Sequence, residues 1–429
     1  MSAEWQEAQL SELITVKHGF AFKGEHFSDS ATAYQLVTPG NFSIGGGFQL
    51  GKGKYYNGPV PNDYVLQKGE VVVTMTDLSK AADTLGFAAV IPKTQGTTWL
   101  HNQRVGLIEV RPNAPLTLGF VHYLMRTSEY RHWVVSSATG STVKHTAPSR
   151  ICSYRFRLPP VSDQIGIANI LTALDDRITL LRETNATLEA IAQALFKSWF
   201  VDFDPVRAKL EGRAPEGMDE ATARLFPDSF EESELGLVPR GWRVESVYTV
   251  STLIYGAPFA SKQFNSNRDG APLIRIRDLR DEAPGVFTPE VHPKGYMVQP
   301  GDIVVGMDGE FRAYLWGGEP AWLNQRVCVV APKAGCPAAF VHRAIMPLLA
   351  AVEASETATT VIHLGKNDID RFRILVPDAR VLAAFGKLTG GLYSKIVNSK
   401  QSARTLATLR DTLLPRLISG QLRLTLESN

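Results

Sequence analysis

The chain has 429 residues, of which 44% are hydrophobic and 21% charged, and its formal net charge is +2. This length accommodates two or three domains with complete cores, and the composition is that of a globular protein, which excludes a largely disordered chain. Residues 202–240 contain ten acidic and five basic side chains, which leaves the rest of the chain modestly basic at +7, a charge compatible with nucleic-acid contact that does not demand it.

The N-terminal residues 1–10 lack the basic start and apolar run of a signal peptide, and apolar runs of membrane-spanning length are missing from the sequence. We therefore expect a cytoplasmic protein without a membrane partner. The cysteines are too few and too scattered for a disulfide framework or a zinc cluster, and we expect all three to be buried: Cys152, Cys328 and Cys336.

Residues 1–157 are predicted to form a mixed α and β domain. Short β-rich runs at 34–37, 70–73 and 105–110 are separated by Gly, Pro and Asn residues, which favour turns. The apolar spacing predicts a helix from Leu118 to Trp133. A polar loop rich in hydroxyl groups follows at residues 136–145.

Residues 158–203 are predicted to contain one long helix. Pro159 and Pro160 forbid an earlier start, Ser162 can cap the first turn, and Asp204-Pro205 supplies a stop. The apolar positions alternate steps of four and three, which is the spacing of a coiled-coil seam that needs a partner helix. These positions are Ile167, Leu171, Leu174, Ile178, Leu181, Asn185, Leu188, Ala192, Leu195 and Trp199.

An acidic connector rich in Pro and Gly spans residues 204–240, and a second domain follows at 241–377 that repeats the first with drifting offsets. The run 64–75 matches 296–307, and the run 102–105 matches 324–327. The remaining matched positions are Trp5 with Trp242, Gly19 with Gly256, Phe22 with Phe259, Phe27 with Phe264, Leu36 with Leu273, Phe120 to His122 with Phe340 to His342, and Thr142, Val143 and His145 with Thr360, Val361 and His363.

A second long helix is predicted at residues 378–420, before a tail at 421–429, because its apolar residues match the first seam in phase. We predict an α+β fold in which two similar mixed α/β domains are joined by two long antiparallel coiled-coil helices, with a pseudo-two-fold internal repeat. Two readers held apart by such a spacer suit two separated DNA sequences. The alternatives are two ordinary core helices and a domain duplication with an unrelated function.

Catalytic signatures are missing from the sequence. It contains no Gly-x-Gly-x-x-Gly after a strand, no Walker A loop, no His-Glu-x-x-His and no Gly-x-Ser-x-Gly. The glycines at 45–47 and 51–53 favour turns over phosphate binding. We therefore predict no catalytic residues and no metal site.

Several polar groups suit contact with DNA. Asn102, Gln103 and Arg104 carry side chains that pair with adenine and guanine edges, and Asn324, Gln325 and Arg326 repeat the set. Because these residues are identical in both halves, scaffold or phosphate contact is favoured over base readout. The polar loops suit phosphate contact, with structural turns as the alternative; they supply Thr139, Ser141, Thr142, Lys144 and His145, then Thr359, Thr360, His363 and Lys366.

Base readers are expected where the two halves diverge. In the first half these positions follow a matched strand or the turn at Pro39-Gly40, and they are Asn41, Thr76, Asp77, Ser79 and Lys80. In the second half the corresponding places hold Arg275, Arg277, Asp278, Asp308, Glu310 and Arg312.

Four segments carry a resemblance to the specificity subunits of type I restriction-modification systems, and the resemblance extends over nearly the whole chain. They are LPPVSDQI at 158–165, LFKSWFVDFDP at 195–205, SELGLVPRGW at 233–242 and LLPRLISG at 413–420. The second helix departs from the pattern because Val376-Pro377-Asp378 replaces the double proline and the glutamine is lacking.

The resemblance implies two target recognition domains that each read one half of a bipartite, asymmetric DNA sequence. It further implies assembly with two methyltransferase subunits, which use S-adenosylmethionine to methylate adenine at N6, and with two motor and nuclease subunits, which use ATP and Mg. This subunit itself would bind no cofactor. Ile170, Phe196 and Phe200 could dock the methyltransferase subunits or pack on the chain's own domains. Other readings are a self-contained methyltransferase or nuclease with fused recognition domains, and a structural coiled-coil adaptor.

Overall fold

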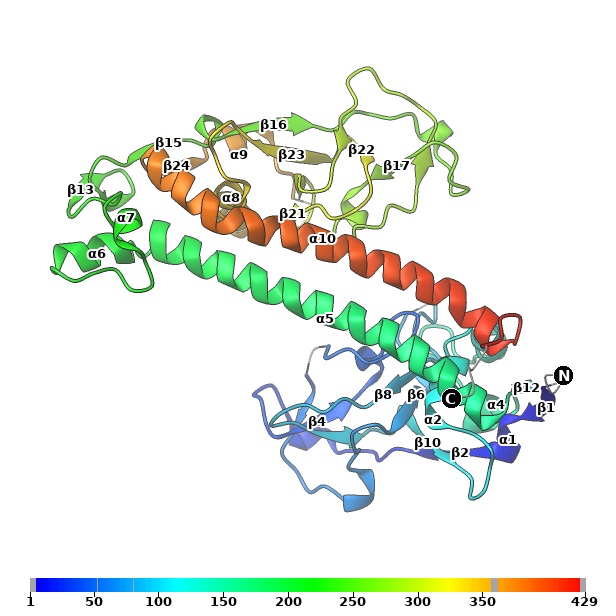
Figure 1. Ribbon diagram of the computed structural model, residues 1–429. Coiled ribbons are helices and arrows are strands. Elements are labelled where there is room, and N and C mark those ends of the chain that lie inside the picture. The colour runs from blue at the N-terminus through cyan, green and yellow to red at the C-terminus, as the bar shows by residue number, and fades with distance from the viewer. Residues whose placement is uncertain (1–4, 52, 80, 356–361, 425–429) are drawn as a thin grey trace. The chain divides into compact units, whose positions relative to one another are not determined.

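The computed structural model of the chain describes residues 5–51, 53–79, 81–355 and 362–424 (Figure 1). The chain divides into two compact units, residues 1–177 with 406–429 and residues 178–405. Two 40-residue helices, α5 (Val161–Phe200) and α10 (Ala379–Ile418), each contribute residues to both units. Each unit therefore consists of one mixed α/β domain together with part of each long helix.

The first unit contains two four-stranded sheets, with strand orders β2-β10-β6-β8 and β3-β5-β4-β9. The first sheet is antiparallel, whereas β4 and β9 form a parallel pair in the second. Two further strand pairs, β1-β12 and β7-β11, complete the unit. The strands are β1 (Gln6–Gln9), β2 (Ile14–His18), β3 (Phe27–Ser28), β4 (Tyr34–Val37), β5 (Tyr55–Tyr56), β6 (Val71–Thr74), β7 (Thr76–Asp77), β8 (Ala88–Val90), β9 (Thr98–His101), β10 (Val105–Val110), β11 (Lys144–His145) and β12 (Arg155–Leu158), and the shorter helices are α1 (Leu10–Leu13), α2 (Leu118–Leu124), α3 (Ser128–Val135) and α4 (Pro148–Cys152).

The second unit repeats most of this topology. Its sheets have the orders β16-β23-β20-β21, which is antiparallel, and β18-β17-β22-β19, in which β17 and β22 are parallel. The pair β15-β24 corresponds to β1-β12, so the strand order confirms the predicted internal repeat for the antiparallel sheet and for this pair. In the other sheet the parallel pair recurs, but it lies at the edge of the sheet in the first unit and in the centre in the second. The strands are β15 (Arg243–Ser246), β16 (Ser251–Tyr255), β17 (Ala271–Ile274), β18 (Phe287–Thr288), β19 (Met297–Val298), β20 (Ile303–Gly306), β21 (Ala313–Leu315), β22 (Ala321–Leu323), β23 (Val327–Pro332) and β24 (Arg373–Val376), and the shorter helices are α8 (Ala338–Ser355) and α9 (Lys366–Asp370).

The acidic connector is folded. It forms helices α6 (Asp204–Leu210) and α7 (Glu220–Ala223) and a hairpin of β13 (Phe230–Ser233) and β14 (Gly236–Pro239). Val206 and Phe226 are buried in the core of the second unit. Pro205 lies in the first turn of α6, so it begins a new helix as well as preventing the extension of α5.

The helix predicted at 118–133 is broken. The structure has α2 and α3 with a gap at residues 125–127, because the Thr127 hydroxyl accepts a hydrogen bond from the Tyr130 amide at 3.4 Å and caps a new helix. The equivalent helix α8 is continuous over 18 residues. Helix α8 is long and apolar enough to cross a membrane, but its apolar residues Phe340, Val341, Ile345 and Leu349 are buried in the core of the second unit.

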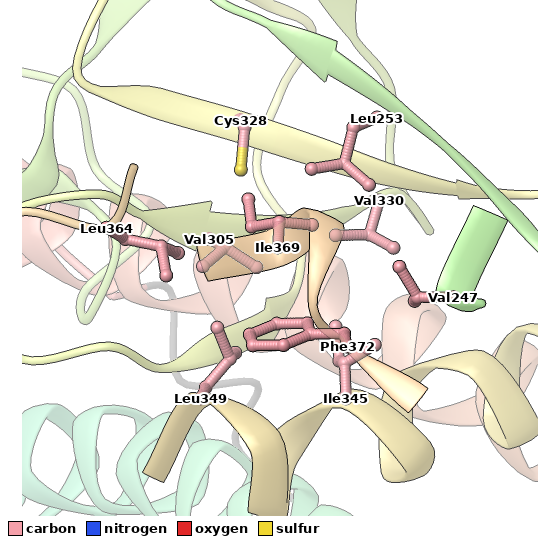
Figure 2. A pocket seen from close by; sticks show the side chains of 10 residues that line it. All are labelled: Val247, Leu253, Val305, Cys328, Val330, Ile345, Leu349, Leu364, Ile369 and Phe372. Carbon is pink, nitrogen blue, oxygen red and sulfur yellow. The ribbon is translucent and has the colours of Figure 1, made fainter. Parts of the chain in front are cut away.

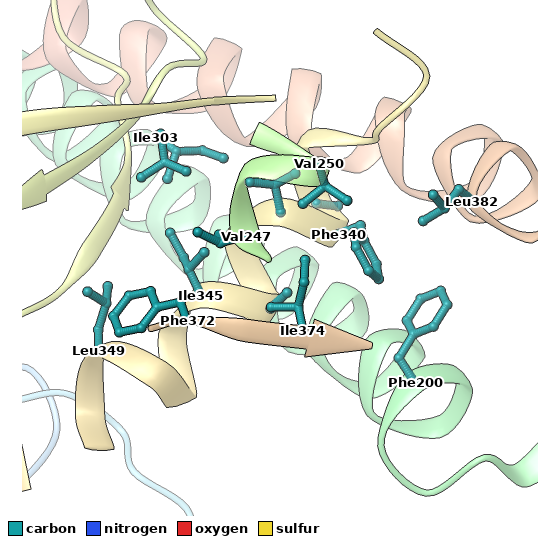
Figure 3. Packing of buried hydrophobic residues seen from close by; sticks show 14 of the residues in the cluster. Phe200, Val247, Val250, Ile303, Phe340, Ile345, Leu349, Phe372, Ile374 and Leu382 are labelled. Atoms are coloured by element: carbon teal, nitrogen blue, oxygen red, sulfur yellow. The ribbon is translucent and has the colours of Figure 1, made fainter. Parts of the chain in front are cut away.

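Helices α5 and α10 pair in antiparallel fashion, as predicted. Within the second unit the Asn185 Nδ2 donates to the Ile396 carbonyl at 3.2 Å, and further along α5 the Trp199 ring lies 5.6 Å from that of Phe385. All ten predicted seam residues of α5 are buried or half-buried. Phe200 of α5 packs on Phe340 of α8 and on Phe385, and Figure 3 shows Phe200 beside Phe340 in this core.

Gln164 anchors the start of α5 on the first domain. Its buried amide donates to the carbonyls of Pro115 and Pro159 at 2.8 and 2.9 Å and accepts from the Thr117 amide at 2.8 Å. The residue in the matching place of α10 is Leu382, which is buried in the apolar core of the second unit. The side chain of Asp378 accepts a hydrogen bond from the Arg380 amide at the start of α10.

Replacing Gln164 with leucine, the residue found in α10, is expected to lower the free energy of unfolding by about 2 kcal/mol, because it leaves buried backbone groups of three residues without their partner. The measurement is denaturant unfolding of the full chain. Gln193→Leu on the exposed face of α5 is the control, with an expected change within about 0.5 kcal/mol. Equal stability of the two variants would show that water replaces the Gln164 hydrogen bonds.

Candidate nucleic-acid interface

Three segments that are distant in sequence meet at one edge of each domain. In the first unit the Met75 amide donates to the Arg104 carbonyl at 3.0 Å, and the Thr146 amide donates to the Met75 carbonyl at 3.0 Å. In the second unit the Met307 amide likewise donates to the Arg326 carbonyl at 3.0 Å, and the Leu364 amide donates to the Met307 carbonyl at 2.8 Å. The end of a central strand, the Asn-Gln-Arg turn and the polar loop are thus brought together twice.

In each Asn-Gln-Arg turn the asparagine supports the turn, and the glutamine and arginine side chains are exposed. The Asn102 side chain is buried and accepts from the Arg104 amide at 3.1 Å, while its carbonyl accepts from the Val105 amide at 3.0 Å. In the second unit the Asn324 side chain accepts from the Gln325 amide at 2.8 Å, and the Asn324 carbonyl accepts from the Val327 amide at 3.0 Å. The two asparagines therefore hold the turn, and the exposed side chains are those of Gln103, Arg104, Gln325 and Arg326.

The polar side chains beside this turn differ between the units. In the first unit the Thr76 hydroxyl lies 3.2 Å from Nδ1 of His145, in the β7-β11 pair. In the second unit the Asp308 carboxylate lies 2.6 Å from Nδ1 of His363 and 3.1 Å from Nη1 of Arg326. This cluster was not predicted from the sequence, although sliding one half onto the other places Thr76 on Asp308 and shows that the two halves differ at this position.

Asp77 is part of the scaffold. It is 4% exposed and accepts hydrogen bonds from the Ser79 amide at 2.6 Å and from the Thr84 hydroxyl at 2.7 Å. Burial raises the pKa of this carboxyl, but the hydrogen bonds from Ser79 and Thr84 outweigh burial and hold the pKa below its usual value. The predicted base contact of Asp77 does not fit this position, since its acceptors are used to shape the loop. Ser79 is half-buried, and Lys80 lies outside the described residues.

Asn41 and Asp278 occupy matching turns in the two units. Asn41 is 1% exposed; its Oδ1 accepts from the Thr38 amide at 2.8 Å, and its Nδ2 donates to the Leu50 carbonyl at 2.9 Å. Asp278 is 7% exposed and accepts from the amide and the Nε of Arg275 at 3.0 and 3.1 Å. The predicted base contact does not fit these two buried residues either, whereas Arg277 is exposed.

Among the other candidates Thr76 is buried and Arg275 and Asp308 are half-buried, whereas most of the rest lie at the surface. Arg312 is bound to Glu353 at 2.6 Å, a hydrogen bond that raises the pKa of the guanidinium, and Glu310 is exposed. Thr359 and Thr360 lie outside the described residues. The remaining candidates are exposed, except for the half-buried Lys144: Thr139, Ser141, Thr142, Lys144, His145, His363 and Lys366.

The described residues show no group of three or more His, Cys, Asp or Glu side chains placed to hold a metal ion. Figure 2 shows a cavity in the core of the second unit, with a volume of about 10 Å³ and an entirely apolar lining that includes Cys328 and Phe372. It is too small and too apolar for a cofactor. Cys328 is buried as predicted, but Cys152 and Cys336 are only half-buried, and all three are free thiols.

A buried polar network missed by the sequence analysis ties both long helices to the first domain. The Asp175 carboxylate of α5 accepts from Arg126 at 2.5 Å, from the Tyr123 hydroxyl at 3.0 Å and from Arg410 of α10 at 2.7 Å. Arg126 also donates to the Gly45 carbonyl at 2.9 Å, so the glycine run at 45–47 is a turn held by an arginine. Sequence periodicity gave no signal for these partners, because they are up to 235 residues apart.

Comparison with known proteins finds relatives that are all specificity subunits or domains of type I restriction systems. A family model described as the type I restriction modification DNA specificity domain matches residues 2–190. The specificity subunit of the type I restriction enzyme HindI from Haemophilus influenzae is 25% identical over 377 residues, covering 73% of this chain and 79% of that protein. The MjaIX specificity subunit of Methanocaldococcus jannaschii is 24% identical over 372 residues, covering 84% and 79%.

The EcoBI specificity subunit of Escherichia coli is 31% identical over 186 residues, covering 42% of this chain and 39% of that protein. Among solved structures, the S subunit of a type I restriction-modification system from M. genitalium aligns with a TM-score of 0.57 at 15% identity, covering 96% of each chain. This last likeness is one of fold, and it extends over both halves of the repeat. The chain is therefore similar, over most of its length, to the DNA specificity subunits of type I restriction-modification systems.

Proposed function

We propose that this subunit recognises a bipartite, asymmetric DNA sequence, with each unit reading one half. The observation that carries the proposal is the duplicated edge, where the same strand end, turn and polar loop present exposed Gln and Arg side chains in both units. Phosphate contacts from the shared residues would position each domain, and differing neighbours would supply sequence preference. Duplicated scaffolds with different polar surfaces are what two readers of different sequences require.

The proposed partners are two methyltransferase subunits and two motor and nuclease subunits, in the cytoplasm. The methyltransferase subunits would hold S-adenosylmethionine and methylate adenine at N6, and the motor subunits would use ATP and Mg. Phe200 is buried and Phe196 half-buried in the core of the second unit, so they support its packing, whereas Ile170 is 38% exposed. Docking candidates are the exposed apolar residues of the long helices: Val161, Ile165, Ile170 and Leu409 in the first unit, and Leu180, Ile191 and Leu388 in the second.

The test is to express the full chain with its methyltransferase subunits and to sequence methylated adenines in the host DNA. We expect one bipartite motif that disappears when this chain is omitted. Exchanging residues 1–157 for the equivalent domain of another specificity subunit should change one half of the motif. Methylation by the purified chain alone, or a change in both halves after the exchange, would contradict the proposal.

A further inference from the structure

One position in the duplicated edge differs in chemistry while its neighbours are constant. Thr76 and Asp308 follow the matched methionines; Thr76 lies next to His145 of the polar loop, and Asp308 lies next to His363 of the polar loop and Arg326 of the turn. The backbone bonds of the preceding methionines, to the turn and to the polar loop, are the same in both units. The difference between the halves at this place is therefore a difference of side chain, not of scaffold.

In the second unit, Asp308 restrains Arg326. The carboxylate is 22% exposed, whereas the side chains of Arg326 and His363 are 56% and 50% exposed. One oxygen of Asp308 contacts both Nη1 of Arg326 and Nδ1 of His363, so the guanidinium is fixed through one nitrogen. A guanidinium has five N–H donors in a planar fork, which leaves an edge free for another partner.

In the first unit, a hydroxyl stands where the carboxylate is. Thr76 contacts His145 at 3.2 Å, and within the described part of the chain the Arg104 side chain has no hydrogen-bond or ion-pair partner. Arg104 thus keeps its rotamer freedom. Arg326 forms an ion pair with Asp308, and the Asp308 carboxylate would repel a phosphate.

We propose that residue 308 determines how the constant arginine is used. Asp308 is a positioning residue that holds Arg326 with its free edge toward a guanine, whose N7 and O6 accept a bidentate arginine. Arg104, without a carboxylate beside it, contacts a phosphate. This inference rests on the proposed function, because it assumes that this edge faces DNA.

The test compares Asp308→Thr, which copies the first unit, with wild type, using selection of bound sequences from DNA randomised in each half-site. The full chain with its methyltransferase subunits is used. We expect the preference for one G·C pair in the half-site of the second unit to fall about 10- to 100-fold, with the other half-site unchanged. Arg326→Lys should give the same loss, because lysine keeps the charge but lacks the fork.

The control is Glu232→Gln, which removes one exposed negative charge from the connector of the second unit and should leave both half-sites unchanged. Denaturant unfolding of Asp308→Thr with wild-type stability shows that the second unit of the variant is folded. The inference would be overturned if Asp308→Thr kept the base preferences of wild type and its DNA affinity fell more steeply with salt, by about one phosphate contact. That result would assign Arg326 to a phosphate. Failure of wild type to select any bipartite sequence would instead overturn the proposed function.

Discussion

Replacing Asp175 with alanine is expected to lower the free energy of unfolding by about 3–5 kcal/mol, the largest effect of the substitutions considered for this chain. The substitution leaves Arg126, with 3% of its side chain exposed, without its carboxylate, and it leaves Arg410, with 18% exposed, with the exposed Asp411 alone. A buried charge that has lost its partner costs more than the pair contributes when intact. Denaturant unfolding of the full chain gives the value.

Asp176→Ala is the matched control, because Asp176 is the next residue of α5 and is exposed. Its expected change is within about 0.5 kcal/mol. Similar losses in the two variants would indicate that helix propensity, not the buried network, explains the effect. A small loss for Asp175→Ala would mean that water enters and solvates both guanidinium groups.

The contribution of Asp175 should also depend on pH. Burial raises the pKa of this carboxyl, but the adjacent Arg126 and the hydrogen bonds from Arg126 and Arg410 outweigh burial, so the pKa in the folded chain lies below the usual value. A lowered folded pKa gives stability that is complete above the unfolded pKa of about 3.9 and is lost as the pH falls through the folded pKa. The difference between wild type and Asp175→Ala should therefore be constant near pH 7 and shrink below about pH 4.

Replacing Gly256 with alanine is expected to destabilise the second unit by about 3 kcal/mol and to abolish recognition of its half-site. A Cβ at this position would lie 1.9 Å from the Asn324 carbonyl oxygen, which is backbone and cannot rotate away. The turn that would move carries Gln325 and Arg326. Gly19→Ala should do the same to the first half-site, since its Cβ would lie 2.1 Å from the Asn102 carbonyl oxygen.

The controls are Gly285→Ala, where no atom lies within 4 Å of the added carbon, and Gly24→Ala, where the nearest atom is at 3.9 Å. Both should keep wild-type stability within about 0.5 kcal/mol and select both half-sites. Unfolding and sequence selection are measured on the same preparations. Loss of both half-sites in Gly256→Ala with normal stability would show that the two units do not read independently.

Several elements could be predicted because short-range chemistry decides them. The run 34–37 is a strand with those bounds, and 105–110 is another, since β-branched and apolar residues stand between Gly, Pro and Asn turns. The four-and-three spacing on α5 predicts which residues are buried, because the period of a helix fixes which side chains share a face. Gly19 and Gly256, which the repeat places at matching positions, make the same close approach to backbone in both domains.

The candidate site was predicted less completely. Asn41, Asp77 and Asp278 are polar residues in turns, and the sequence does not distinguish a side chain that faces solvent from one that satisfies the turn's own amides. The break at residues 125–127 was missed for a similar reason, since a threonine within a helical pattern becomes a cap only when the chain has room to turn.

By itself the sequence determined the duplicated scaffold, the two long helices and their seam, because periodicity and turn chemistry depend on residues that are close in sequence. Only the tertiary structure decided which polar side chains remain free at the surface. The Asp308 contact with Arg326 and the Asp175 contact with Arg410 join residues from separate segments, and the orientation of each side chain depends on the fold that brings its partner within hydrogen-bond distance.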